Sequence, residues 1–236
     1  MIKQSVHIPT VFENIISDIK SSVSGEINSI NIGVENTEYF TDHINLLFLK
    51  VGMLIEIDNV QFEVLEVDYS SFSVKNYGFS SIPTEWNIAI YYNFGHLKEI
   101  NKILASKQNV QINRFPLVWL MLDIIETKNN YLAYETEATL KFSFSYFSKS
   151  DYLAEQRADN IINKYLQPIV DLFIHFISSN YKDFYFDEES VNWNEIKRYK
   201  YGSQEKDMNI FNTVTDAIEI EIQSLKIKNT KNNCLI

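Results

Sequence analysis

The chain has very little of several features that define common protein classes. It contains a single Cys, at position 234, which excludes a disulfide framework and a cluster of thiolate metal ligands. Only 6 Gly and 4 Pro occur among 236 residues, which argues against collagen-like and low-complexity chains. No apolar run approaches the roughly 20 residues that a transmembrane helix needs. We therefore expect a folded protein of a reducing compartment, with no membrane partner.

Positive charge is also scarce. The chain has 21 Lys and Arg against 31 Asp and Glu, and its only Arg residues are at 114, 157 and 198. A protein that wraps DNA through phosphate contacts needs clustered basic residues, so this class is disfavoured. An acidic wall past which DNA slides without sticking stays compatible with the composition.

Signatures of catalysis are absent as well. The four His residues show no metal-ligand spacing, and no phosphate-binding glycine loop or nucleophile elbow occurs. We expect no catalytic residue, metal or cofactor, and no enzyme activity. One alternative stays open: Glu195 and Lys197, with Asp183, Asp187 or Glu188 upstream, match the carboxylates and lysine of Mg²⁺-dependent nucleases.

In the first half of the chain, the spacing of the apolar residues changes twice. Apolar residues at helical spacing follow Thr10, a good helix cap, and Gly25 is the expected end of this helix. From 44 to 92 the period is two, with a tight turn at Asp58 and Asn59, which predicts a small antiparallel meander. Residues 86–92 read as its last strand, and helical spacing returns at 97–104. We therefore predict a β-rich inserted module at 35–94 within a core formed by 1–34 and 95–236.

The second half predicts long strands around a long helix. Residues 116–125 form a nearly continuous apolar run, as in a strand buried on both faces, and 138–146 alternate strictly between apolar and polar. Ser148 or Ser150 should open a helix that Pro168 kinks or divides. A last strand follows at 217–227, in which Ile and Glu alternate from Ile218 to Ile222. The fold class is therefore α+β, with helices packed on a mainly antiparallel sheet and a β-rich insertion.

Large aromatic residues and an arginine interrupt an otherwise polar stretch near the C-terminal third. These are Trp193, Arg198, Tyr199 and Tyr201. Such residue types anchor protein interfaces, so we predict that they contact a neighbouring subunit. The alternative that they pack back onto the parent domain remains open.

The order of segments from 115 to 227 resembles the tail-terminator or tail-completion proteins of tailed bacteriophages. The matching pieces are the run 115–120 (FPLVWL), the strand 135–147, the helical segments 155–158 (EQRA) and 166–169 (LQPI), and the closing 215–220 (TDAIEI). The Ile- and Asn-rich composition looks like that of neck proteins of crAss-like phages. The resemblance covers about half of the chain and brings no active-site residue with it.

The resemblance implies a structural role. In that family a small α+β unit assembles into a homo-oligomeric ring that closes a tail or joins head to tail. It implies a virion protein, assembled in the host cytoplasm, with portal, neck or tail proteins as neighbours and DNA passing without specific binding. We assign Glu219 and Glu221 to the acidic lumen of this ring. A Mg²⁺-dependent nuclease and a monomeric binding module that uses the 44–92 region are the alternatives.

Overall fold

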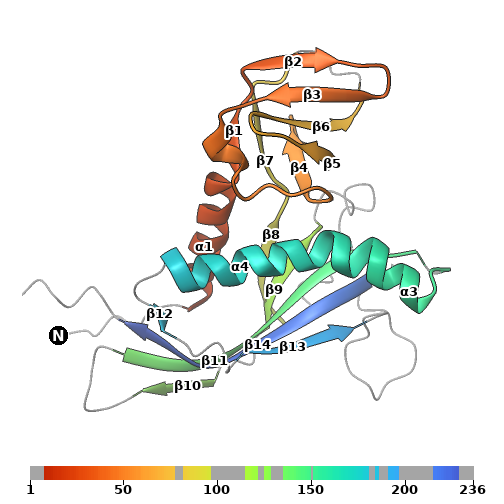
Figure 1. Cartoon of the computed structure of the whole chain (residues 1–236). Coiled ribbons are helices and arrows are strands. Elements are labelled where there is room, and N and C mark those ends of the chain that lie inside the picture. The colour runs from red at the N-terminus through yellow and green to blue at the C-terminus, as the bar shows by residue number, and fades with distance from the viewer. Residues whose placement is uncertain are drawn as a thin grey trace, which may run out of the picture.

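The computed structural model describes residues 8–77, 82–96, 115–121, 125–128, 135–149, 151–180, 184–185, 191–196 and 215–228. Within them the protein is a mixed α+β structure, mostly sheet, with a curled antiparallel sheet and two helices, so the predicted class is confirmed at this level (Figure 1). The elements are α1 (Ile8–Ser22), β1 (Ser24–Glu26), β2 (Ser29–Ile32), β3 (Asn36–Phe40), η1 (His43–Leu46), β4 (Leu54–Ile57), β5 (Val60–Val67), β6 (Ser71–Lys75), β7 (Glu85–Ile88), β8 (Tyr91–Gly95), β9 (Leu117–Met121), β10 (Ile125–Lys128), β11 (Glu135–Phe147), α3 (Ala154–Arg157), η3 (Ala158–Leu166), α4 (Gln167–Asn180), β12 (Phe184–Tyr185), β13 (Val191–Ile196) and β14 (Thr215–Lys228).

The first sheet closes into a small barrel. Its strand order is β1-β7-β4-β5-β6-β3-β2, so the two consecutive strands β1 and β2 lie at its opposite ends. The two residues between them join these ends: Ile27 N–H donates to Thr84 O beside β7, and Asn28 N–H donates to Phe40 O of β3, both at 2.8 Å. Closure pairs the backbone groups that an open sheet would leave at its edges.

Local chemistry explains the tight turns and the filling of the barrel. Asp58 and Asn59 have φ of 50° and 62°, the left-handed values that a two-residue hairpin requires, which confirms the predicted turn. Inside the barrel the ring of Phe72 lies 5.5 Å from Tyr39 and 5.0 Å from Trp86. All three side chains are buried, so an aromatic stack takes the place of a ligand cavity at the barrel centre.

The second sheet is built on two long strands. β11 and β14 pair along almost their whole length, with one irregularity after Ala138. β9 and β10 follow one another along the outer side of β11, while β12 and β13 lie along the outer side of β14. β8 completes the sheet by pairing in parallel with β9, the one parallel ladder among the described strands.

Both helices pack on one face of this second sheet. Phe142 and Phe144 of β11 each lie 5.1 Å from the ring of Phe173 in α4. Phe12 of α1 joins the same cluster, 4.8 Å from Phe142 and 6.1 Å from Phe173. Because β14 pairs in register with β11, its buried Ile218, Ile220 and Ile222 share this helix-covered face.

The limits of the β-rich part differ from the sequence prediction of 35–94. The barrel begins at β1 and ends at β7, so it spans 24–88. The predicted last strand, 86–92, is two strands in different sheets: β7 ends at Ile88, and β8 begins at Tyr91. Alternation alone could not show this, because Ala89 and Ile90 at the bend are buried like their neighbours. The predicted helix at 97–104 lies outside the described residues.

The long helix also departs from its predicted course. It begins at Ala154, where the Gln156 side chain accepts a hydrogen bond from Leu153 N–H, and not at Ser148 or Ser150. Pro168 is the second residue of α4, directly after the preceding helical segment ends at Leu166, so it lies where one segment gives way to the next, and α4 continues beyond it to Asn180. The preceding residues 158–166 form π-type turns, the last of which bonds Gln167 N–H to Ile162 O. Proline, which has no N–H, therefore falls where the hydrogen-bond pattern changes from π to α, and its missing donor causes no break.

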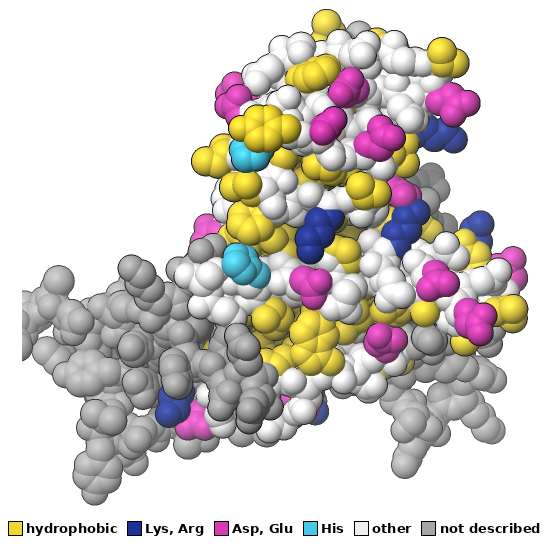
Figure 2. Space-filling model, in the orientation of Figure 1, with side chains coloured by type: hydrophobic (Ala, Val, Ile, Leu, Met, Phe, Trp, Pro, Cys, Tyr) yellow, Lys and Arg dark blue, Asp and Glu magenta, His cyan; other side chains and the backbone are white. Residues whose placement is uncertain are grey.

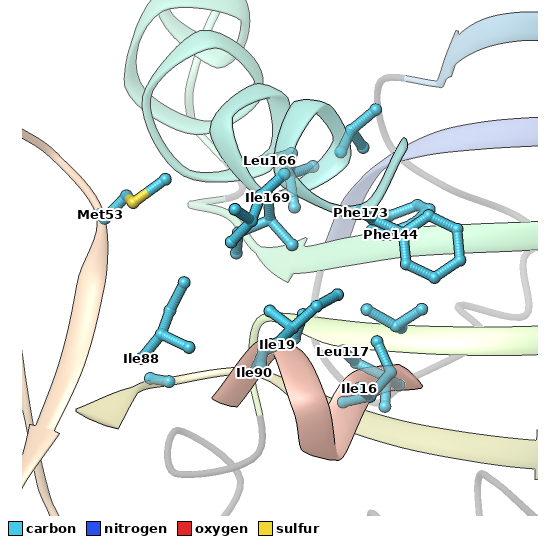
Figure 3. Packing of buried hydrophobic residues seen from close by; sticks show 14 of the residues in the cluster. Ile16, Ile19, Met53, Ile88, Ile90, Leu117, Phe144, Leu166, Ile169 and Phe173 are labelled. Atoms are coloured by element: carbon cyan, nitrogen blue, oxygen red, sulfur yellow. The ribbon is translucent and has the colours of Figure 1, made fainter. Parts of the chain in front are cut away.

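The barrel and the second sheet share one continuous core. Figure 3 shows Met53 and Ile88 of the barrel beside Ile19 of α1 and Leu166 and Ile169 of the long helix, and all five are buried. The β-rich part is therefore packed directly against the rest of the chain. Whether either unit folds alone stays a prediction.

Polar contacts reinforce the boundary between the two units. Glu63 of β5 accepts a hydrogen bond from Tyr165 OH at 2.9 Å and pairs with Lys164 Nζ at 2.6 Å. Glu56 of β4 accepts from Tyr91 OH, while Gln61 donates to Phe115 O at 2.8 Å. Burial, with the neighbouring carboxylate second, raises the pKa of Tyr91 and of Tyr165, so both phenols keep the protons they donate.

The closest backbone approach at this boundary is at Gly52. Its φ is +88°, and a Cβ built there would lie 3.2 Å from Lys164 Cγ and 3.3 Å from Lys164 O. Gly52 N–H also donates to Val64 O at 2.8 Å, which fixes this peptide against the barrel. A side chain at this position would strain the backbone and push the helix away.

We expect Gly52→Ala to lower the free energy of unfolding by about 1 to 3 kcal/mol, the cost of a strained backbone plus a tight contact. The neighbouring Val51→Ala is the control, and because Val51 is exposed its effect should stay within about 0.5 kcal/mol. Urea unfolding followed by circular dichroism measures both. Equal urea midpoints for Gly52→Ala and the wild type would show that the helix yields at no cost.

Candidate functional site

The outer strand of the second sheet, β13, is the part of that sheet best suited to contact another chain. β13 pairs with β14 from Val191 to Ile196, and within the described residues no strand pairs with its other side. Four of its six residues are exposed, and the indole of Trp193 is 46% exposed. An edge strand presents backbone donors and acceptors that can pair with a strand of another chain. A half-exposed tryptophan on such an edge is typical of an interface anchor.

The structure places one of the four predicted interface residues. Trp193 lies opposite Ile220 in the β13–β14 ladder. Arg198, Tyr199 and Tyr201 lie outside the described residues. The prediction that the four residues act together therefore stays a prediction, with Trp193 as its described member.

The two predicted lumen residues lie on the face of β14 opposite the helices. Glu219 and Glu221 are each half-buried and alternate with the buried isoleucines. Glu221 also pairs with Lys141 Nζ of β11 at 3.0 Å. Hydrogen bonds from Gln223 and Lys141 lower the pKa of the Glu221 carboxyl, so it is ionised at neutral pH. The pairing places a positive charge beside one of the two predicted negative charges.

Most of the acidic excess lies in the barrel. Residues 24–88 contain ten Asp and Glu against two Lys, a net charge of −8 out of −10 for the whole chain. Figure 2 shows acidic side chains spread over the barrel, with hydrophobic ones between them. The remaining residues are nearly balanced, so the two units differ in electrostatic character.

A shallow groove on the barrel surface is also acidic. It has a volume of about 390 Å³, and Glu38, Glu66 and Asp68 stand around Ser71 and Ser73. Ser71 Oγ donates to Glu38 at 2.8 Å, and Ser73 Oγ lies 3.4 Å from Glu66. These hydrogen bonds hold the two glutamates within the barrel surface. Among the described features, this groove corresponds best to the predicted ligand-binding role of the 44–92 region.

The residues of the nuclease alternative are not brought together in the described part of the chain. Glu195 is exposed on β13, while Asp183, Asp187, Glu188 and Lys197 lie outside the described residues. No group of three or more potential metal ligands occurs within the described residues. No described contact favours a nuclease site.

A buried ion pair between the long helix and β14 was not predicted from the sequence. Arg157 Nη1 lies 2.9 Å from Asp216 Oδ1, and their side chains are 2% and 0% exposed. The same guanidinium donates to Ser148 Oγ, Tyr152 O and Lys149 O, at 2.6 to 3.0 Å. With this many partners the ion pair holds the long helix and β14 in a fixed relative position. The available signal was the scarcity of arginine, since Arg157 is one of three and lies in an apolar helical pattern.

The comparisons add no relative. Models of known families, curated proteins and solved structures gave no match to this chain. Separately, none of the helices in the described ranges has the length and apolar character needed to cross a membrane. The function must therefore be argued from the surfaces described above.

We expect Arg157→Met to lower the free energy of unfolding by about 3 to 5 kcal/mol, because it leaves the Asp216 carboxylate buried without its charged partner. The double variant Arg157→Met with Asp216→Leu should recover at least half of this loss, since no lone charge then remains. Lys141→Met is the control: it breaks an ion pair with 50% and 29% exposed side chains and should cost less than about 1 kcal/mol.

Urea unfolding of the single, double and control variants measures these differences. A double variant no more stable than Arg157→Met would show that the cost comes from the lost hydrogen bonds of Arg157 and not from the unpaired charge.

Proposed function

We propose that this protein is a structural subunit of a tailed-bacteriophage virion. In this proposal it assembles with further copies into a ring in the neck or at the end of the tail, around the path of the DNA. Its neighbours are portal, neck or tail proteins. Its role is to close the tail or to connect the head to the tail, and the chain performs no catalysis.

The observation that carries the proposal is the outer side of β13, which pairs with no strand among the described residues and carries Trp193. Ring assembly needs a surface that each copy offers to the next in the same way, and an edge strand offers regularly spaced backbone groups for this. Trp193 adds the large apolar contact that such an interface needs.

The arrangement of the second unit also supports the proposal. The segments that resemble tail-completion proteins are the strands β9, β11 and β14 and the helix that covers them. Two of these segments, one containing Arg157 and the other Asp216, meet in the buried ion pair. Weak sequence patterns 59 residues apart thus contribute to one structural feature.

We expect Trp193→Ser to weaken assembly by about 30-fold in the dissociation constant, equivalent to about 2 kcal/mol for the loss of an interface anchor. Light scattering over a concentration series measures this, with circular dichroism to verify the fold. Tyr69→Ser, which removes a 73% exposed aromatic residue from the barrel, is the matched control and should assemble as the wild type does.

Two results would contradict this proposal at different levels. A Trp193→Ser variant that keeps the wild-type oligomer would remove β13 from the interface. A wild-type protein that is strictly monomeric, alone and with its virion neighbours, would rule out the ring.

The lumen assignment predicts a change in DNA retention. Glu219→Gln with Glu221→Gln should increase retention of duplex DNA at low salt, because two negative charges are lost per subunit and Lys141 loses its partner. The matched control is Glu35→Gln with Glu38→Gln, which makes the same charge change on the barrel. Electrophoretic retention at two salt concentrations measures both. Equal or greater retention by the barrel variant would place the β14 face away from the DNA path.

A further inference from the structure

A second exposed surface lies on the barrel, in the segment between β3 and β4. Residues 43–53 are apolar on both sides. Leu46, Leu49 and Met53 point inward and are buried. A surface segment normally turns polar residues outward, because exposed apolar side chains gain nothing from water.

The outer side of this segment is nevertheless mostly apolar, with Lys50 as an exposed charged residue. Ile44 is 70% exposed, and Leu47 and Val51 are each 60% exposed. Tyr69, 73% exposed, extends the surface by stacking on the His43 ring, with centroids 4.1 Å apart and planes 18° from parallel. We call His43, Ile44, Leu47, Val51 and Tyr69 the outer strip.

The backbone beneath the outer strip is held in place. Leu49 N–H donates to Leu46 O at 3.0 Å, and Met53 N–H donates to Lys50 O at 3.1 Å. Gly52 fixes the end of the segment between Val64 and the long helix. A preorganised apolar surface loses little conformational entropy on binding, which is typical of a docking site.

Charge indicates what can cover this strip. It lies on the unit that carries a net charge of −8. Asp42 and Asp68 precede His43 and Tyr69 in the chain and are exposed, and the exposed Lys50 before Val51 offsets only part of this charge. A second copy docked strip to strip would bring two such barrels together, and DNA or an anionic lipid surface would meet the same repulsion. A partner that is apolar at its centre and basic at its rim satisfies both features.

We propose that the outer strip docks a partner protein through an amphipathic segment of that partner, with aliphatic residues against Ile44, Leu47 and Val51 and Lys or Arg residues facing the surrounding carboxylates. Tyr69 offers an exposed ring on which an arginine or an aliphatic side chain can stack. This surface belongs to the barrel and not to the sheet that carries β13. The inference goes beyond ring assembly and does not rest on it.

The test uses the full chain and a fluorescently labelled synthetic helical peptide of Leu and Lys with one apolar face. A peptide of the same pattern with Glu in place of Lys is the probe control. Ile44→Ser with Leu47→Ser removes the centre of the strip. Ile32→Ser with Val34→Ser is the matched control, because these residues are 76% and 98% exposed on the same barrel and the charge again stays constant.

Fluorescence anisotropy should show binding of the Leu/Lys peptide, weakened at least about 10-fold by the strip variant and less than about 2-fold by the control. The Leu/Glu peptide should not bind. Trp193→Ser should bind the Leu/Lys peptide as the wild type does, so failure of ring assembly and failure of this inference give different results. Circular dichroism establishes that each variant is folded.

Three results would overturn the inference. Equal binding of the Leu/Lys peptide by the strip variant and the control would show attraction by net charge alone. A wild-type dimer that the strip variant abolishes would identify a second copy as the occupant. Binding to vesicles of phosphatidylglycerol and phosphatidylcholine, lost in the strip variant, would identify a lipid surface.

Discussion

The buried contact between Arg157 and Asp216 fixes the geometry of the second unit. It joins the first turns of the long helix to the first residues of β14. The guanidinium also holds the backbone at Lys149 and Tyr152, which connects β11 to that helix. Three segments are thus positioned by one side chain. A charge removed from water needs its partner and its hydrogen bonds in place together, so the arrangement is all or none.

The orientation of the long helix then determines the rest of the core. Phe173 of this helix lies 5.1 Å from the rings of both Phe142 and Phe144, so this packing depends on where the helix lies on the sheet. Farther toward its N-terminal end the same helix brings Lys164 against Gly52 and Tyr165 against Glu63. The helix therefore links the sheet to the barrel, and its position affects both units.

The two units offer different kinds of surface. Within the part of the chain that the structure describes, the sheet ends at β13, an edge strand to which backbone hydrogen bonding can add another strand. In the barrel, the backbone groups of Ile27 and Asn28 are already bonded to Thr84 and Phe40, which joins its two ends. It offers side chains instead: carboxylates and a row of aliphatic residues. The two proposed interfaces therefore rest on different kinds of contact, backbone pairing at β13 and side-chain packing on the barrel.

Sequence reasoning worked where the determinants are local. The alternation in β11 and β14 and the turn at Asp58 and Asn59 follow from residues near in sequence, and the structure has them as predicted. It failed where the structure depends on contacts between segments that are distant in the sequence. Nothing local shows that Ala89 and Ile90 carry the chain from one sheet into another, or that Arg157 meets Asp216. The exposure of the outer strip could not be predicted either, because its residues are mostly of the apolar types that form a core.

The position of α1 has a consequence for synthesis of the chain. Phe12 finds its partners at Phe142 and Phe173, roughly 130 and 160 residues farther along. At about 5 to 20 residues per second, the apolar face of this first helix is made about 8 to 30 seconds before the residues that cover it. The strand pairings of the barrel all lie within 24–88, so every strand of the barrel has been made well before that time. The nascent chain therefore presents the apolar face of α1 to the cell while the sheet that will bury it is still being made.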